Sequence, residues 1–465
     1  MIPIRILLIQ PGYRRNAIGF DRMIFCEPLG LEMVAGALKG HQVRILDMRL
    51  EPELDRVVLS FNPDLCGISC CYTIDVPSSL LIARRLKQNG SKPFVVVGGH
   101  HATMMPEDFF REEIDAVVVG EGEETMRDLA DRLERGGDLW KVPGLFIRDG
   151  KTFSCTGVRE LVEDLDSLPF PDHGALQGYR RNYHMGFQKP LALAETTRGC
   201  SHRCHFCSVW IFYQGRCRMK SPERVLSELM SIRERNILFT DDNFLISASR
   251  AEEIAGLLKK MGIQKRFTFQ ARSDTIVQHP DLLARWKEVG LSGVFIGFEK
   301  IEDEALASLE KRNSVKNNEQ ALEILRILGI EVWASFIVDP DYEEEDFERL
   351  RQYIIDHRIK TPTFSVLTPL PGTRLFEEEG KNLTTRDYRL FDIAHAILPT
   401  RLPLSEFYRQ YASLWDTPYS KYSLIWEGFR ALLKGHFTLP ELMRMLRSAQ
   451  KLSDPSFYLS SAMES

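Results

Sequence analysis

The sequence predicts an α/β protein in three parts: a doubly wound, Rossmann-like parallel sheet, a partial barrel of six β/α units, and a helical C-terminal region. Three observations support this prediction. Short apolar runs alternate with helix-like segments in residues 1–150, and the same alternation returns about six times in 191–375. Residues 376–465 have helical periodicity, and residues 151–190, which lose periodicity, are expected to form a linker.

The composition is that of an ordinary globular protein, with 44% hydrophobic and 27% charged residues among 465. A net charge of −5 argues against a general nucleic-acid binder. No apolar run approaches the roughly 18 residues that a membrane span needs. Met1–Gln10 begins directly in a strand-like pattern, and the nine cysteines are an odd number. These features favour a reducing, cytoplasmic location.

In the first domain, glycines follow two of the expected strands. Gly98–Gly99 follows the fourth strand, and Gly120 and Gly122 follow the fifth. Glycine lets a flat or phosphorylated ligand approach the backbone closely, and ligands of parallel sheets bind at the carboxyl ends of strands. Ordinary turn chemistry explains a glycine pair equally well. The expected strands are 4–9, 43–46, 65–69, 94–97 and 116–119, and the expected helices are 29–38, 78–87 and 125–134.

In the middle domain, apolar runs bounded by turn residues predict six strands, each followed by a helix. The expected strands are 191–195, 236–240, 266–271, 293–298, 331–338 and 362–367. The expected helices are 222–235, 250–261, 280–289, 303–311, 317–328 and 343–357.

Three cysteines follow the first strand of the middle domain, as Cys200-x-x-x-Cys204-x-x-Cys207. Their loop therefore leaves the carboxyl end of a barrel strand, where active sites collect. Three thiolates are one short of a closed zinc or iron–sulfur site. Cys217 and two histidines within the loop keep a zinc site possible. An iron–sulfur cluster with three protein ligands would leave one iron open to a substrate or cofactor.

A cysteine triplet with an aromatic residue before its third member resembles the signature of the radical S-adenosylmethionine (SAM) superfamily. The N-terminal layout resembles the cobalamin-binding domain of one branch of that superfamily. The resemblance implies a 4Fe–4S cluster on Cys200, Cys204 and Cys207, with SAM at its open iron and cobalamin in the first domain. It also implies that a 5′-deoxyadenosyl radical removes hydrogen from an unactivated carbon, which then receives a methyl group from methylcobalamin.

The resemblance extends to residues that would bind SAM: Phe206, Asp241, Asp242, Arg272, Gly297 and Glu299. The acidic pair stands where the family has Gly-Gly-Glu and suits the SAM amino group, although aspartates also form turns. Arg272 would grip the SAM carboxylate or form a salt bridge at the barrel mouth. Gly293–Glu299 is similar to the family's adenine-binding segment, with its glutamate one residue early.

The resemblance also implies cobalamin contacts at strand ends of the first domain: Ser69, Cys70, Thr73, Gly98, Gly99, His100, Gly120, Glu121 and Glu123. Cys70 and Cys71 could face the corrin, but small buried hydrophobes are the favoured interpretation of this pair. The Asp-x-His-x-x-Gly motif that supplies a lower cobalt ligand in many cobalamin domains is absent, because the first strand ends in Gln10–Tyr13.

Two segments narrow the expected substrate. Ala334–Pro340 and the proline-containing loop Leu367–Thr373 look similar to hopanoid methylases of this branch. The resemblance thus implies methylation of a hopanoid or another lipid, with electrons from a donor such as flavodoxin or ferredoxin. Oxidative cyclisation or rearrangement without methyl transfer is the alternative reaction. A cobalamin-binding sensor or an electron-transfer protein is the alternative of another class.

The C-terminal region has two amphipathic segments, 404–414 and 422–434. Residues 421–451 contain six basic and two acidic side chains, a balance of +4. The favoured interpretation is a helical cap packed over the barrel. The alternative is peripheral contact with the inner face of an anionic membrane, for which an apolar face with basic neighbours is suited.

Overall fold

The computed structural model describes residues 3–12, 23–88, 90, 92–416, 428–433 and 435–463. The chain forms two compact units. Unit 1 consists of Met1–Arg15 and Pro28–Tyr179, and unit 2 of Asn16–Glu27 and Arg180–Ser465. The aperiodic stretch 151–190 is thus shared between the two units.

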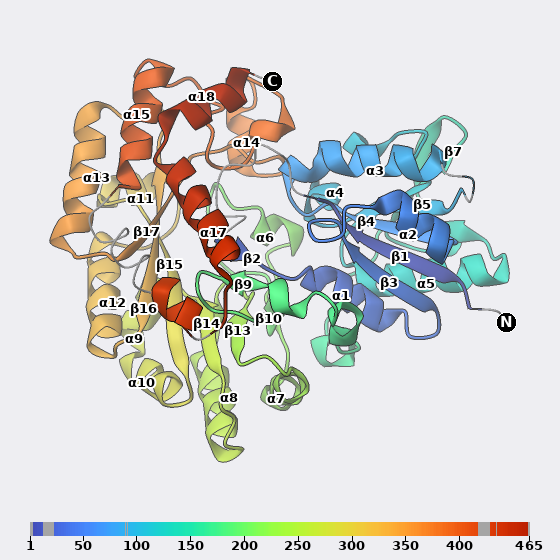
Figure 1. The fold of residues 1–465 in the computed structure, drawn as a ribbon, viewed down its shortest axis with the longest axis horizontal. Coiled ribbons are helices and arrows are strands. Elements are labelled where there is room, and N and C mark those ends of the chain that lie inside the picture. Colours follow the sequence, from blue (N-terminus) through green and yellow to red (C-terminus); the bar gives the residue numbers. More distant parts are fainter. Residues whose placement is uncertain are drawn as a thin grey trace. The chain divides into compact units, whose positions relative to one another are not determined.

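Unit 1 contains a seven-stranded sheet in the order β3-β1-β4-β5-β6-β7-β8 (Figure 1). The first five strands in this order are parallel, and the β7–β8 hairpin adds two antiparallel strands. The strands are β1 (Arg5–Gln10), β3 (Gln42–Asp47), β4 (Leu65–Ser69), β5 (Phe94–Gly98), β6 (Ala116–Val118), β7 (Leu145–Asp149) and β8 (Thr152–Cys155). This is the doubly wound sheet that the sequence predicts.

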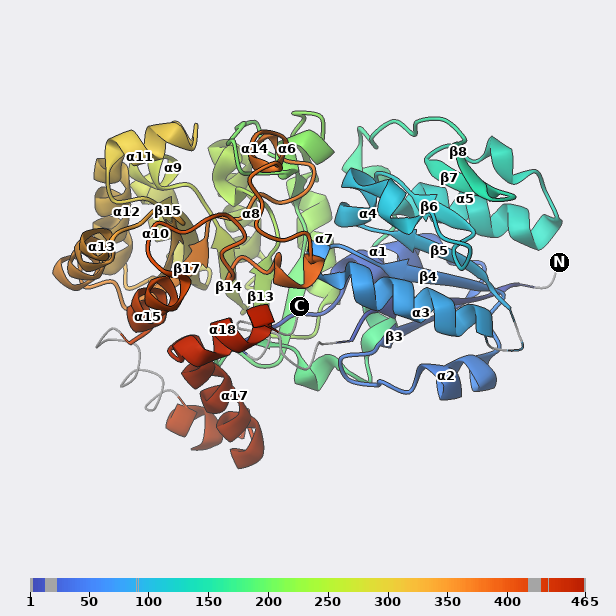
Figure 2. The same cartoon turned by 90° about the horizontal axis from the view of Figure 1, so that it is seen from above.

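The helices of unit 1 lie on both faces of this sheet. They are α1 (Leu29–Ala37), α2 (Leu54–Phe61), α3 (Val76–Gln88), α4 (His100–Met104) and α5 (Gly122–Arg135). Figure 2 shows α1 and α5 on one face, and α2 and α3 on the other. The chain direction across the sheet reverses between β1 and β4, which marks the carboxyl ends of those strands as the expected ligand edge. Three of these elements are not among the predicted ones: the short helices α2 and α4, and the β7–β8 hairpin.

Unit 2 contains a six-stranded parallel sheet in the order β10-β13-β14-β15-β16-β17. Its strands are β10 (Leu191–Ala194), β13 (Asn236–Phe239), β14 (Arg266–Gln270), β15 (Leu291–Glu299), β16 (Glu331–Val338) and β17 (Thr361–Val366). The helices between them are α7 (Pro222–Ser231), α8 (Ala248–Lys260), α9 (Ser273–Gln278), α10 (Pro280–Glu288), α11 (Asp303–Ser308), α12 (Val315–Ile327) and α13 (Glu344–Asp356). The predicted partial barrel of six units is confirmed.

The barrel core lies between its strands and the surrounding helices. Trp286 of α10 is fully buried, and it meets the rings of Phe239, Phe244, Phe267 and Phe269 edge-on, at centroid distances of 5.0–6.1 Å. Its indole N–H donates to the carbonyl of Ala251 at 3.1 Å, which satisfies the one polar atom of the ring. Alternate strand residues therefore face the helices, and the residues between them face the barrel interior.

Two C-terminal helices complete this core. Tyr408 and Tyr411 of α15 (Leu404–Leu414) and Tyr458 of α18 (Pro455–Met463) are buried in the barrel cluster. The Tyr411 hydroxyl donates to the carbonyl of Phe364 in β17 at 3.1 Å. These two helices pack over the barrel as a cap, and they lie outside 421–451, the stretch in which the basic side chains gather.

The second predicted amphipathic segment, 422–434, lies outside the described residues except for 428–433. The remaining C-terminal helices are α14 (Arg374–Glu379) and α17 (Leu439–Leu452). Within the described ranges, every helix is too short or too polar to cross a membrane.

Candidate active site

The cysteine loop of unit 2 begins and ends in a short antiparallel hairpin. Strands β11 (Thr197–Arg198) and β12 (Arg218–Met219) pair, with Arg198 opposite Arg218. Gly199 follows β11 with a φ of +90°, and a Cβ at this position would lie 2.1 Å from the carbonyl oxygen of Arg216. Only glycine fits there, and the close approach fixes the base of the loop.

Asp241 and Arg250 form hydrogen bonds with the chain at the two ends of this hairpin. The Asp241 side chain is fully buried and accepts hydrogen bonds from the amides of Thr196 and Thr197, at 2.6 and 2.7 Å, and from the Thr196 hydroxyl at 2.6 Å. Arg250 of α8 donates to the carbonyls of Lys220 and Thr196, at 2.7 and 3.0 Å. Burial raises the pKa of Asp241 to about 6, against these hydrogen bonds. Both carboxylate oxygens of Asp241 therefore already accept hydrogen bonds from this chain.

Asp242 is the exposed carboxylate at the same strand end. Desolvation by the surrounding protein, together with the charges of Asp241 and Glu195, raises its pKa to about 7. Of the two aspartates predicted to hold the SAM amino group, Asp242 is therefore the one left accessible to a ligand.

The three thiols of the loop are half-buried, and so is Phe206. Burial raises the pKa of Cys207 to about 12 and raises the pKa of Cys200 and of Cys204. A bare thiolate is unfavourable in such surroundings, whereas iron supplies the positive charge that stabilises it. Three soft sulfur donors on one loop fit a 4Fe–4S cluster with an open iron.

Arg272 follows β14 and is already paired within the chain. It donates to the Asp274 carboxylate at 2.7 Å and to the carbonyls of Lys311 and Arg312, both at 3.0 Å. These contacts are those of a salt bridge at the barrel mouth, one of the two predicted roles. Its contact with a SAM carboxylate stays a prediction.

Glu299 at the end of β15 forms a buried ion pair with Lys311, at 2.5 Å. The Lys311 ammonium also donates to the Gly297 carbonyl at 2.5 Å. A Cβ on Gly297 would lie 2.1 Å from the Glu299 carboxylate, so the ion pair occupies the space that a larger residue would fill. Glu299 has a φ of +62°, at a register shift in β15 that accompanies its early place in the motif. Lys311 is not among the predicted site residues: the sequence predicts it at the end of the helix 303–311, whereas α11 ends at Ser308 and Lys311 lies in the loop that follows.

The candidate cobalamin edge of unit 1 is built mainly from backbone. Ser69 of β4 and Gly98 of β5 are paired in register. The Cys70 amide donates to the Gly98 carbonyl at 2.7 Å, and Gly99 has a φ of +121°. A Cβ on Gly99 would lie 2.8 Å from the Cys70 carbonyl oxygen. The Cys70 side chain is fully buried, and burial raises its pKa well above the ordinary value. It packs as a small hydrophobe.

A buried histidine connects the loops that follow β4 and β5. The ring of His101 lies 3.0 Å from the Thr73 hydroxyl through Nδ1 and 3.0 Å from the Asp108 carboxylate through Nε2. Its neighbour His100 is half-buried, and burial together with the charge of His101 lowers the pKa of His100 to about 4. Thr73 and His100 are predicted site residues, whereas His101 is not, because its contact with Thr73 spans 28 residues of sequence.

The end of β6 adds an open stretch of backbone. Gly120 has a φ of +85°, and a Cβ there would meet open space. Its amide donates to the Thr103 hydroxyl at 3.0 Å. Glu121 accepts from the Val162 amide at 2.8 Å, and Glu123 is buried. Bare backbone at adjacent carboxyl ends fits a flat, extended ligand such as cobalamin.

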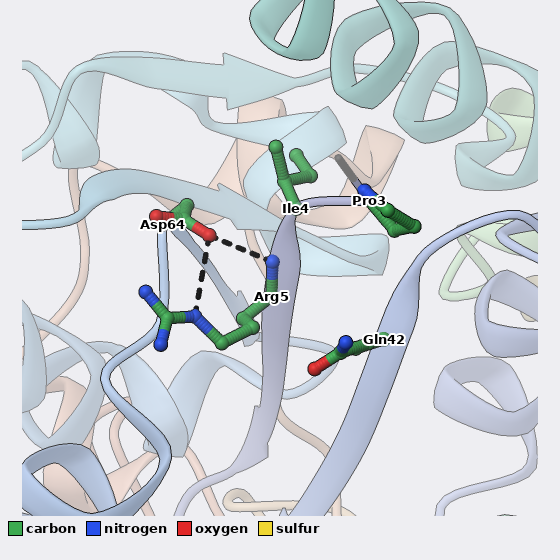
Figure 3. Close-up of a pocket in the computed structure, with 5 residues that line it drawn as sticks. All are labelled: Pro3, Ile4, Arg5, Gln42 and Asp64. Atoms are coloured by element: carbon green, nitrogen blue, oxygen red, sulfur yellow. Dashed lines mark hydrogen bonds and ion pairs between the residues drawn. The ribbon is translucent and has the colours of Figure 1, made fainter. Parts of the chain in front are cut away.

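A hollow of about 440 Å³ lies at the opposite edge of the unit 1 sheet. Figure 3 shows its lining residues, Pro3, Ile4, Arg5, Gln42 and Asp64, with Arg5 paired to Asp64. These residues lie at the amino ends of strands, away from the edge where parallel sheets bind ligands. The hollow is therefore separate from the candidate cobalamin edge.

Both units are similar to known proteins. The family model of the B12-binding domain matches residues 22–130, and that of the radical SAM superfamily matches residues 194–354. The hopanoid C-3 methylase of Methylococcus capsulatus is 37% identical over 440 residues, which cover 92% of this chain and 83% of that enzyme.

Two solved structures have the same fold. The cobalamin-dependent SAM radical enzyme OxsB, solved with aqua-cobalamin and SAM, matches with a TM-score of 0.70 at 18% identity, over 99% of this chain and 75% of that one. The radical SAM methyltransferase TsrM of Kitasatospora setae, solved with cobalamin and a 4Fe–4S cluster, matches with a TM-score of 0.65 at 18% identity, over 83% and 76%.

A B12-binding domain followed by a radical SAM barrel with a cysteine triplet defines the class of cobalamin-dependent radical SAM enzymes. The chain belongs to this family, and it is a radical SAM methyltransferase whose cofactors are cobalamin, a 4Fe–4S cluster and SAM.

Proposed function

We propose that the chain methylates an unactivated carbon of a polycyclic lipid of the hopanoid class. The observation that carries this proposal is the likeness to a hopanoid C-3 methylase along nearly the whole chain. When bound, the three cofactors supply a hydrogen-abstracting radical and a transferable methyl group. The chain's own residues must hold the cofactors and position an apolar substrate.

The barrel interior supports an apolar substrate. Phe295 of β15 and Trp333 of β16 are neighbours in register and are half-buried. They alternate with core residues, so they face the interior. One level nearer the mouth stand three small side chains in register, Gly297, Ser335 and Thr363. The two aromatic side chains suit an apolar ring system, while the level nearer the mouth borders the Glu299–Lys311 ion pair at Gly297.

In the proposed site, Cys200, Cys204 and Cys207 hold the cluster, and the accessible Asp242 binds the SAM ammonium. The glycine-rich strand ends that carry Gly98–Gly99 and Gly120 hold the cobalamin. Reducing electrons come from an external donor of the flavodoxin or ferredoxin type.

Product mass with methyl-labelled SAM tests the proposal. The reduced, cofactor-loaded enzyme is incubated with a hopanoid and labelled SAM, and we expect one labelled methyl group in the product together with 5′-deoxyadenosine. A hopanoid left unchanged while 5′-deoxyadenosine forms would reject the lipid substrate. An altered product without label would favour the cyclisation or rearrangement alternative. Absence of 5′-deoxyadenosine would favour a sensor or electron-transfer role.

The C-terminal helices support a second proposal, contact with an anionic membrane. Phe429, Leu433, Leu439 and Met443 are 42–73% exposed. Three exposed arginines lie in the same segment, at 430, 444 and 447. Apolar side chains that insert among headgroups, with cations that attract anionic lipid, are the elements of an interfacial surface.

Vesicle co-sedimentation tests this contact. We expect binding to phosphatidylglycerol vesicles that weakens in the Leu433→Glu/Met443→Glu variant. Ile327→Glu is the matched control, since Ile327 is 75% exposed on α12, outside this segment. Equal sedimentation of all three proteins would reject the proposal.

A further inference from the structure

The outer side of the cysteine loop contacts α14, which follows the last strand of the barrel. The Leu375 amide donates to the carbonyl of His205 at 3.3 Å, and Arg374 Nη2 donates to the carbonyl of Arg203 at 3.0 Å. The His205 ring also lies 2.9 Å from the Glu378 carboxylate. Backbone and side chains of α14 thus hold the middle of the loop.

Arg374 makes two further contacts. The same Nη2 pairs with the Glu310 carboxylate at 2.6 Å, and the guanidinium lies 5.5 Å from the ring centre of Trp210 in α6 (Val209–Phe212). Arg203 lies 5.8 Å from the same ring, whose N–H donates to the Cys204 carbonyl at 3.1 Å. We call this group the Arg374 bridge; it consists of Arg203, Trp210, Glu310 and Arg374.

The position of Arg374 is fixed from the strand side. Thr373 is fully buried; its hydroxyl donates to the Leu370 carbonyl at 2.7 Å and accepts from the Phe376 amide at 3.1 Å. Pro369 and Pro371 stiffen the loop before it. Arg374 therefore begins α14 at a set distance from the end of β17.

The sheet topology shows why this contact matters. β10 and β17 are the two edge strands of the open six-stranded sheet. The cysteine loop follows β10, and α14 follows β17. The Arg374 bridge therefore joins the loops of strands that do not pair with each other, and it completes the barrel mouth.

We propose that Arg374 is a positioning residue that closes the open barrel at its mouth and holds Cys204 and its loop in the geometry that a cluster requires. The proposal rests on the assignment of the cluster to Cys200, Cys204 and Cys207. A charge-assisted hydrogen bond to the loop backbone, shared with an ion pair, restricts the loop more than an apolar contact would.

Arg374→Ala tests the proposal in two states of the full chain. In the cluster-free protein, we expect amide hydrogen exchange in residues 200–207 to accelerate about tenfold, the change that loss of roughly 1.4 kcal/mol of local stability produces. In the reconstituted protein, we expect iron release to a chelator to accelerate severalfold. Arg374→Lys keeps a cation but not the planar guanidinium, so both effects should be partly rescued.

Arg326→Ala is the matched control. Arg326 is similarly exposed on α12, pairs with Glu323 and donates to the His357 carbonyl, each at 2.6 Å, outside the cysteine loop. Unchanged exchange and iron release in Arg374→Ala would overturn the proposal, as would equal effects of the control. Should Arg374→Ala fail to fold, Glu310→Gln provides the same two readouts, and no change in either would overturn the proposal. If the wild-type chain assembles no cluster, the cluster assignment is rejected. Amide hydrogen exchange in the cluster-free protein would still test whether Arg374 restrains the loop.

Discussion

The two cofactor edges of this chain are built by different means. The candidate cobalamin edge of unit 1 is built from backbone at Gly99, which packs closely against Cys70, and at Gly120, which has open space around it. The cluster edge of unit 2 relies on side chains. Asp241, Arg250 and Lys311 are buried, charged and paired with other parts of the same mouth.

This difference reflects what each cofactor needs. A large flat ligand gains from surface contact, and a protruding side chain would hinder it. A metal cluster instead needs a few donors held at fixed positions, which depends on a supporting set of hydrogen bonds and ion pairs. Substitutions at the edge of unit 1 should therefore act through steric conflict. Substitutions at the edge of unit 2 should act through the loss of hydrogen bonds and ion pairs.

The largest expected effect is at the cluster edge. Cys204→Ala removes one of the three proposed sulfur ligands, and we expect loss of the iron–sulfur absorption in the visible while cobalamin binding persists. The ultraviolet–visible spectrum of the anaerobically reconstituted protein measures both. Cys155→Ala, at an exposed cysteine of β8, is the control. Loss of cobalamin together with the cluster would show that the two edges are not independent.

Trp286→Ala tests whether the barrel core stabilises unit 2 alone or is also needed for cobalamin binding by unit 1. Loss of a fully buried indole should lower the free energy of unfolding of the barrel by about 3–5 kcal/mol. Denaturant unfolding measures this change, and cobalamin affinity should stay at the wild-type value. Trp140→Ala, at a 45% exposed side chain of unit 1, should cost far less. Equal costs for the two tryptophans would contradict the core assignment.

Gly99→Ala tests the steric argument at the cobalamin edge. A methyl group there meets the Cys70 carbonyl oxygen at 2.8 Å in a left-handed backbone conformation. We expect cobalamin to bind at least about tenfold more weakly, as a loss of roughly 1.4 kcal/mol or more implies, with the cluster spectrum unchanged. Gly120→Ala has similar backbone strain but open space for the methyl, so its effect should be smaller. The reverse order would refute the steric reading.

The smallest expected effect is the pH dependence of the cobalamin edge. The pKa of His100 in the folded chain is about 4, lowered by burial and by the charge of His101 from an ordinary 6.5. The neutral ring therefore stabilises the fold fully above pH 6.5, and this contribution is lost as the pH falls toward 4. Each pKa unit is worth about 1.4 kcal/mol. We discount the full value because His100 is only half-buried, and expect about 1–2 kcal/mol between about pH 7 and pH 4.5.

Denaturant unfolding of the ligand-free chain at the two pH values measures this loss. His100→Asn should remove most of the difference, and His436→Asn, at an exposed histidine of unit 2, should leave it in place. A His100→Asn variant with the full wild-type pH dependence would contradict the assignment.

Local patterns in the sequence determined the fold class and the kind of chemistry. Alternating apolar runs predicted all six barrel strands within about two residues of their ends, because strand and helix periodicities are local properties. The spacing of Cys200, Cys204 and Cys207 is likewise local; it indicates a metal site with three thiolates, and the resemblance to the radical SAM superfamily favours a 4Fe–4S cluster over zinc.

Only the tertiary structure shows which side chains stabilise the loops at the ends of the strands. Arg374 and its partner Arg203 are 171 residues apart, and Asp241 and its partner Thr196 are 45 apart, so no short window of sequence contains both members. The roles of Lys311, Arg250 and His101 also depend on contacts between loops of different strands. Such contacts arise when a parallel sheet brings the carboxyl ends of its strands to one edge, which sequence periodicity does not encode.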